Sequence, residues 1–339
     1  MLRNRAVSPM LATLILAAIA VSAGLVYYAQ TSGMFSRLYS RIEVQVVSLD
    51  LYKFEDKALL MVSVRNTGSK PLIGIIISCM DDNGKRFSLA LPPAEPGVTV
   101  NNSLIIPLGV SNLVLDGSGN NNHATIHGSP SWVDGKYGKG LDFKDWQTSQ
   151  YLDVPYTVLD GLTDFTIAFW AVGGGGGEYI ISGSDGHNHN YMLFRGPTAS
   201  GWHFYVWRRG GGYGTHAYKD LARYDWLIYS NPGSPINLAP GGLIIAQEQD
   251  RLGGGFDPSQ AFSGKVDMIC IYSEAISNEE MSMLFNGIII TKNLTFLLPL
   301  DEGSSDPYVF KSGNSYPITV TAYSLDGDVY TRTISTVCA

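Results

Sequence analysis

The chain has 339 residues, of which 45% are hydrophobic, enough for two domains with substantial cores. The formal net charge is −7 and no run of Lys or Arg follows the first few residues, which argues against a nucleic-acid partner because a polyanion needs a basic surface. Charged residues make up only 16%, while Gly (38), Tyr (19) and Trp (6) are plentiful, so the composition predicts a mainly β protein rich in tight turns.

The first expected element is a long N-terminal hydrophobic α-helix. Residues 10–29 are apolar and uncharged, and Arg3 and Arg5 precede them. At ~1.5 Å per residue, such a helix could cross a hydrocarbon core of ~30 Å. No small-x-small cleavage pattern follows the apolar run, so an ordinary cleaved secretory signal is disfavoured and the helix is expected to stay attached.

Residues 5–13, which read RAVSPMLAT, resemble the N-termini of archaeal type IV pilins and the related archaeal flagellins. The resemblance implies that a prepilin peptidase cuts between Ala6 and Val7, leaving a leader of residues 1–6 and an assembly helix of residues 7–41. Pro9 would then lie in the first helical turn, where its missing N–H costs nothing.

In that family the helix holds the subunit in the membrane before assembly and then packs against sister helices. The resemblance therefore implies a homopolymer built by pilus assembly machinery into an extracellular cell-surface filament. Small residues between positions 17 and 24 suit close helix contacts. The alternative is a single-pass, membrane-anchored surface lectin or adhesin that does not polymerise.

Residues 42–102 alternate apolar and polar residues in runs separated by turn signals at 66–68 and 82–84. Too few strands fit there for an Ig-like sandwich of about seven strands. Residues 291–339 supply a further hairpin, and they resemble the end of pilin head domains. We therefore expect an Ig-like pilin β-sandwich formed by 42–102 and 291–339, with residues 103–290 inserted into it; the segment 296–303 fits either part.

The three cysteines do not match a zinc or redox motif. Cys79 and Cys338 are both expected in the small sandwich, where they could form a disulfide, whereas Cys270 is expected to be a buried thiol. Two N-x-S/T sequons, at Asn101 and Asn293, lie near the proposed junctions and predict glycosylation sites.

The inserted segment carries three ordered motifs: DGSGNNNH at 116–123, GKYGKGLDF at 135–143 and FTIAFW at 165–170. Together they resemble the concanavalin A-like jelly rolls of the laminin-G (LamG) and pentraxin group, over about residues 104–287. The resemblance implies an inserted jelly-roll sandwich. The oxygen-rich turn at Asp116 is interpreted as a structural turn.

Residues 247–260 read QEQDRLGGGFDPSQ, and they resemble the metal-binding loop of pentraxins. The resemblance implies a calcium site in which Glu248 and Asp250 are shared carboxylates and Gln249 offers its main-chain carbonyl. Asp257 and Gln260 would complete the outer ion. The chemistry agrees, because calcium takes six to eight carboxylate, amide and carbonyl oxygens, and the glycines at 253–255 let the backbone fold around a common centre.

Pentraxins draw further ligands from an Asp-Asn pair, and the matching position here holds Asn188 and His189. Asn188 can offer a carbonyl oxygen, but a histidine is a poor calcium ligand. The sequence therefore predicts either one or two calcium ions, and Asp185 or Asn190 could supply the missing ligand.

Bound calcium with open coordination positions predicts adhesion to a carbohydrate or another oxygen-rich surface ligand, without catalysis. A surface glycoside hydrolase is a further alternative, because some jelly rolls place acids as Glu-x-Asp-x-x-Glu. Here Gly253 occupies the position of the third acid. A last alternative is a purely structural calcium.

Overall fold

The computed structural model describes residues 20–22, 24–25, 27–28 and 40–339, except 145–148, 174–177, 187–189, 199–200, 209–210, 218–224 and 231–234. Within 187–234 it describes only backbone strands. The cleavage site at Ala6 and Val7 and most of the expected N-terminal helix lie outside these residues, although 20–22, 24–25 and 27–28 are helical. Among the helices of the described residues, none has both the length and the apolar character needed to cross a membrane.

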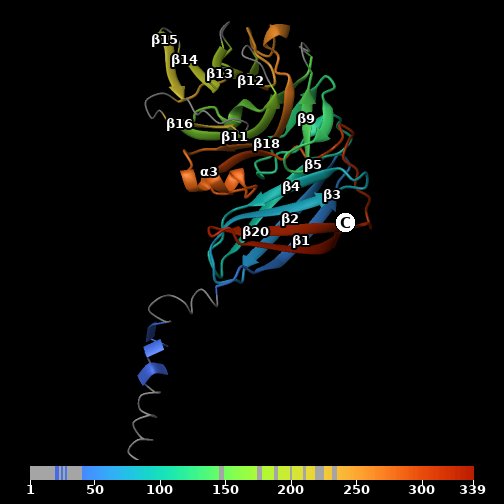
Figure 1. The fold of residues 1–339 in the computed structure, drawn as a ribbon. Coiled ribbons are helices and arrows are strands. Elements are labelled where there is room, and N and C mark those ends of the chain that lie inside the picture. Colours follow the sequence, from blue (N-terminus) through green and yellow to red (C-terminus); the bar gives the residue numbers. More distant parts are fainter. Residues whose placement is uncertain are drawn as a thin grey trace, which may run out of the picture.

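The two ends of the chain form one β-sandwich, which we call the terminal sandwich (Figure 1). Its first sheet has the order β1-β2-β5, and its second has the order β21-β20-β3-β4. Alternate residues of both sheets are buried in one apolar core, which gives the strands their half-buried pattern. The strands are β1 (Val44–Lys53), β2 (Lys57–Asn66), β3 (Leu72–Met80), β4 (Arg86–Leu91), β5 (Thr99–Pro107), β20 (Ser315–Ser324) and β21 (Val329–Val337).

The middle of the chain forms a second and larger sandwich, which we call the inserted unit (Figure 1). One sheet has the order β15-β14-β13-β12-β17-β10-β7-β6, and the other has the order β16-β11-β18-β9-β8, with β19 also pairing with β18. The strands are β6 (Leu113–Val114), β7 (Ala124–His127), β8 (Ser131–Asp134), β9 (Lys139–Phe143), β10 (Tyr151–Val154), β11 (Asp164–Gly173), β12 (Tyr179–Ser184), β13 (Asn190–Thr198), β14 (Gly201–Arg208), β15 (Gly211–Ala217), β16 (Asp225–Ser230), β17 (Leu243–Ile245), β18 (Gly264–Tyr272) and β19 (Leu294–Leu298).

The expected domain limits differ from the strand pairing at both junctions. The strand β5 continues past residue 102, because Leu104 and Ile106 pack in the core of the terminal sandwich. The strand β19 lies after residue 290 but pairs with β18, and Phe296 and Leu298 are buried in the core of the inserted unit. The segment that the sequence left ambiguous therefore belongs largely to the inserted unit.

The two sandwiches share a third apolar cluster. Ile76 and Ala90 of the terminal sandwich pack with Trp170, Cys270 and Tyr272 of the inserted unit. The short helix α3 (Asn278–Phe285) closes this cluster, and its first turn is fixed by a capping box between Ser277 and Glu280. The inserted unit is therefore packed against the terminal sandwich and is not merely tethered to it.

The expected disulfide between Cys79 and Cys338 is not formed, since all three cysteines are free and buried. Both residues do lie in the core of the terminal sandwich. However, Cys79 lies on β3 and Cys338 follows β21, and β20 runs between those two strands. Two strand spacings are ~10 Å, beyond the ~7 Å between Cα atoms that a disulfide can span.

We therefore expect the thiols to be present but unreactive in the folded protein. Burial raises the pKa of the Cys79 and Cys270 thiols to about 12, which leaves almost no thiolate at neutral pH. A thiol reagent should label all three cysteines in denaturant and label Cys79 and Cys270 very slowly without it. A melting temperature that falls on adding a reductant would contradict the free-thiol assignment.

Candidate functional site

The candidate calcium loop, residues 247–260, begins directly after β17 and ends in the short helix η2 (Pro258–Gln260) before β18. Its first three residues are buried: the exposed fraction is 1% for Gln247, 3% for Glu248 and 0% for Gln249. Asp250 is exposed. The loop therefore starts inside the inserted unit and emerges at Asp250.

The side chain of Gln249 holds the loop in place. Its Nε2 atom donates to the Gly242 carbonyl at 3.0 Å and to the Ser182 Oγ and carbonyl oxygen at 3.1 and 3.3 Å. Its Oε1 atom accepts a hydrogen bond from the Gly253 N–H at 3.0 Å. The amide thus links β12, the turn before β17 and the glycines of the loop, which leaves only the Gln249 main-chain carbonyl for the expected metal role.

Asp257 forms the N-cap of η2. Its Oδ1 atom accepts hydrogen bonds from the Ser259 N–H and Oγ, both at 2.8 Å, and its Oδ2 atom accepts one from the Gln260 Nε2 at 3.3 Å. The backbone hydrogen bond from Ser259, followed by that from its hydroxyl, lowers the pKa of Asp257. The carboxylate is thus kept ionised, as a calcium ligand must be.

The expected donors of the loop are not brought together into a metal site in the described part of the chain. Among the described residues, no group of three or more His, Cys, Asp or Glu side chains is arranged to hold a metal ion. Asn188 and His189 lie outside the described residues, and of Asn190 only the backbone is described. By chemistry, the carboxylates of Glu248, Asp250 and Asp257 with the loop amides fit the oxygen preference of calcium.

An aromatic stack supports the loop, and the sequence alone did not reveal it. The rings of His127 on β7 and Tyr151 on β10 stack with centroids 4.3 Å apart, and Phe256 of the loop meets Tyr151 edge-on at 4.9 Å. The Gln247 Nε2 atom donates to the Gln150 carbonyl at 3.3 Å. Two residues of the loop, Gln247 and Phe256, are thus fixed to the start of β10.

The turn at Asp116 is structural, as the sequence indicated. Asp116 is fully buried, and its Oδ1 atom accepts hydrogen bonds from the N–H groups of Ser118 and Leu297. Its Oδ2 atom accepts bonds from the Ser118 hydroxyl and the Asn122 N–H. These four donors satisfy the carboxylate and tie the turn to β19.

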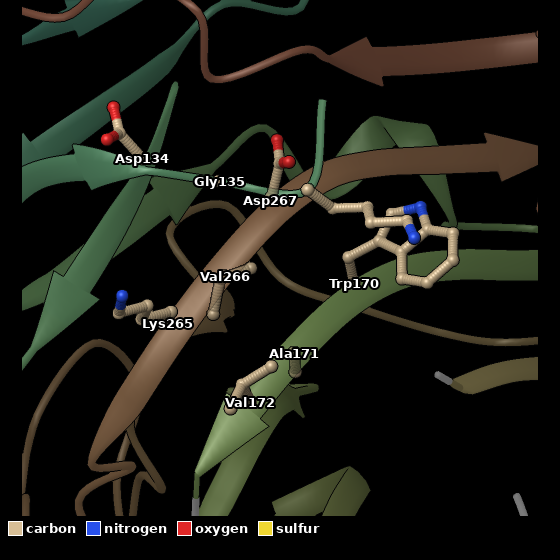
Figure 2. A pocket seen from close by; sticks show the side chains of 9 residues that line it. Asp134, Gly135, Trp170, Ala171, Val172, Lys265, Val266 and Asp267 are labelled. Carbon is tan, nitrogen blue, oxygen red and sulfur yellow. The ribbon is translucent and has the colours of Figure 1, made fainter. Parts of the chain in front are cut away.

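A cavity of about 230 Å³ lies on the six-stranded sheet, between the β8–β9 hairpin, β11 and β18. Figure 2 shows Trp170 and Val172 on one side and Lys265 and Val266 beside them. Asp267 also lines it, with an exposed fraction of 3%, and burial raises the pKa of this carboxyl to about 7. In the sequence, Asp267 is recognisable only as an acid within an apolar strand. Its burial depends on the packing of the β8–β9 hairpin over it.

The two predicted glycosylation sites satisfy the requirement for accessibility. Asn101 is exposed on β5, and Asn293 is exposed in the turn before β19. Glycosylation at either residue stays a prediction.

Comparison with known proteins places a pentraxin-like segment in the inserted unit. Residues 231–297 match the Pentaxin family, and this stretch contains the candidate calcium loop. The chain is 43% identical over 51 residues to Pentraxin-4 of Homo sapiens, which covers 15% of this chain and 11% of that protein. It is 36% identical over 45 residues to Serum amyloid P-component of Bos taurus, covering 13% of this chain and 20% of that protein.

These matches are local, since the chain spans well under a quarter of the length of either relative. The crystal structure of the native heptameric SAP-like pentraxin from Limulus polyphemus aligns with a TM-score of 0.27 and 13% identity, covering 53% of this chain and 85% of that chain. A score this low supports no conclusion about the fold.

We expect Gln249→Ala to loosen the candidate calcium loop. The substitution removes the hydrogen bonds of the Gln249 side chain to Ser182, Gly242 and Gly253, although the Gly242 carbonyl keeps its bond from the Ser184 N–H, and it should cost about 1–3 kcal/mol of the free energy of unfolding. Hydrogen exchange should rise in residues 250–256, while Gln260→Ala, which loses one 3.3 Å bond, should change little. Equal exchange in both variants would show that Gln249 does not hold the loop.

Proposed function

We propose that the inserted unit is a calcium-dependent binding module for glycans or other oxygen-rich surface ligands. The observation that carries the proposal is that the pentraxin-like segment includes the whole loop 247–260, with its three carboxylates and three glutamines. The burial of Glu248 supports it, and so does Gln249, whose side chain bonds to the Gly242 carbonyl and thereby restrains the main chain of the loop.

In this proposal Glu248, Asp250, Asp257 and Gln260 hold calcium with side-chain oxygens, the Gln249 main chain adds a carbonyl, and Asn188 adds an amide oxygen. Calcium supplies open coordination positions for ligand hydroxyl or carboxylate oxygens. The chain itself positions the donors: the side chain of Gln249 fixes the turn, and Phe256 packs on Tyr151.

The proposed module binds and does not catalyse. Gly253 stands where a third acid of the Glu-x-Asp-x-x-Glu glycosidase pattern would be needed. Release of sugar from a panel of polysaccharides would overturn this view in favour of a surface glycoside hydrolase.

Calcium should stabilise the folded protein, and the loop acids should be required. At a calcium concentration ~100 times the Kd, the gain is about 2.7 kcal/mol, or roughly 5–10 °C in melting temperature. Glu248→Gln and Asp250→Asn should abolish this rise and the EDTA-sensitive retention on an immobilised glycan.

The matched control is Glu95→Gln, which neutralises an exposed acid of the terminal sandwich and should keep the full rise. A full calcium effect in Glu248→Gln would exclude the assigned site. A calcium effect lost in the two loop variants, but no retention on any glycan with the wild type, would leave calcium with a purely structural role.

We also propose that the chain is displayed outside the cell as a filament subunit that polymerises through its N-terminal helix. Support comes from residues 5–13, from the uncharged apolar run of residues 10–29, and from a sandwich that unites both ends of the chain. Repeated weak sites along a fibre would act together as one avid surface. The alternative is a surface adhesin anchored singly in the membrane.

Deleting residues 10–29 should abolish filaments in electron micrographs of sheared surface material, because it removes the proposed packing helix. Glu248→Gln should leave filaments intact while removing glycan retention, which separates assembly from binding. Filaments that persist after the deletion would contradict the pilin assignment, and an anchored protein without filaments in the wild type would favour the alternative.

A further inference from the structure

The inserted unit joins the terminal sandwich through two adjacent chain segments, residues 108–115 and 301–309, which we call the neck. Leu108 and Tyr308 form a parallel bridge, and the Asn112 N–H donates to the Ser305 carbonyl at 2.8 Å. The outgoing and returning segments thus contact each other directly. The neck therefore helps, together with the shared apolar cluster, to hold the inserted unit against the terminal sandwich.

A lysine of the terminal sandwich contacts both segments of the neck. Lys85 lies in the turn between β3 and β4 and is 2% exposed. Its Nζ atom donates to the Asp306 carbonyl at 2.7 Å and to the Leu113 carbonyl at 3.4 Å, and lies 4.1 Å from the centroid of the Tyr308 ring. One ammonium group therefore links the returning segment, the outgoing segment and the terminal sandwich.

The same β3–β4 turn is tied to the neck by Asp81. Its Oδ1 atom accepts hydrogen bonds from the N–H groups of Asn83 and Lys85, and its Oδ2 atom accepts one from the Val309 N–H at 2.8 Å. Asp81 is thus satisfied by three backbone donors, and it positions Lys85 against the returning segment.

Glu302 of the returning segment is buried in the neck with only one of its carboxylate oxygens satisfied. Its Oε1 atom accepts hydrogen bonds from the Leu115 N–H at 3.1 Å and the Tyr308 hydroxyl at 3.4 Å. Within the described residues, its Oε2 atom has no hydrogen-bond partner, and the residue is 4% exposed. If Glu302 were ionised, its charged Oε2 atom would have no hydrogen-bond donor. The protonated acid carries no charge, so burying it costs less free energy.

We propose that Glu302 and Lys85 form a proton-sensitive clamp in the neck, closed most firmly when Glu302 is neutral. The neutral acid keeps its bonds to Leu115 and Tyr308 at a low burial cost. The ionised form leaves a charged Oε2 atom without a hydrogen-bond donor in a buried site, a cost that the nearby Lys85 ammonium offsets only in part, so the neck opens more readily. The clamp does not involve the calcium loop, and it holds whether or not that loop binds calcium.

The charges around Glu302 set the direction of its pH dependence. Burial raises the pKa of Glu302 to about 7, the Lys85 ammonium lowers it, and Asp301 raises it. Burial also lowers the pKa of Lys85, against the attraction of Glu302, Asp81 and Asp306. The pKa of Glu302 in the closed neck lies above its ordinary value of 4.5. The contribution of Glu302 to the stability of the closed neck is therefore complete below about pH 4.5 and is lost as the pH rises through about 7.

Hydrogen exchange of the intact chain at about pH 5 and about pH 8.5, corrected for intrinsic rates, tests the clamp. In the wild type, protection of residues 108–115 and 301–309 should fall at least about tenfold at the higher pH, since one pKa unit equals a factor of ten. In Glu302→Gln the fall should vanish, because the amide stays neutral and still accepts the bond from Leu115.

Asp153→Asn is the matched control, because Asp153 lies on β10 outside the neck and burial raises its pKa as well. It should leave the pH response of the neck unchanged. Wild-type pH dependence persisting in Glu302→Gln, or its loss in Asp153→Asn, would overturn the proposal. If Glu302→Gln does not fold, the wild type alone tests the proposal. A loss of exchange protection at the higher pH that is as large in β20 and β21 as in the neck would also overturn the proposal.

Discussion

The pairing of β20 with β3 is the constraint on which the rest of the molecule depends. It joins Ile318 to Cys79 and Ala322 to Ile75, residues from opposite ends of the chain, and it completes the second sheet of the terminal sandwich. The chain between β5 and β20 must therefore leave the terminal sandwich and return to it at one place. The adjacent neck segments, the shared apolar cluster and the buried Lys85 and Glu302 all follow from that requirement.

Strand composition and the alternation of apolar residues were sufficient to predict a mainly β chain and a C-terminal hairpin that pairs back to the start. The limits of the insertion were less predictable. The strand β19 reads as a short apolar run that suits either core, and only its pairing with β18 decides its place. The predicted disulfide failed for a similar reason, because sequence indicates which core holds Cys79 and Cys338 but not that β20 separates them.

At the candidate site, the sequence identified the oxygen-rich loop but not what holds it. The partners of Gln249 come from β12 and from the turn before β17, which no local pattern connects to the loop. The stack of His127, Tyr151 and Phe256 likewise depends on strand register. Glu302 and Asp267 appear in the sequence as ordinary acids beside apolar residues, and only tertiary packing removes them from water.

The order of the first sheet determines how the molecule carries mechanical tension. Both β1 and β5 run antiparallel to β2, so they point the same way, and Val44 and Pro107 lie at opposite ends of the sheet. A ligand pulling on the inserted unit acts on the end of β5, while whatever holds the chain ahead of β1 acts on its start. The ladders are then loaded in shear, across hydrogen bonds that lie perpendicular to the strands. Many bonds must break together, so this sheet resists a pull far better than one opened from its edge.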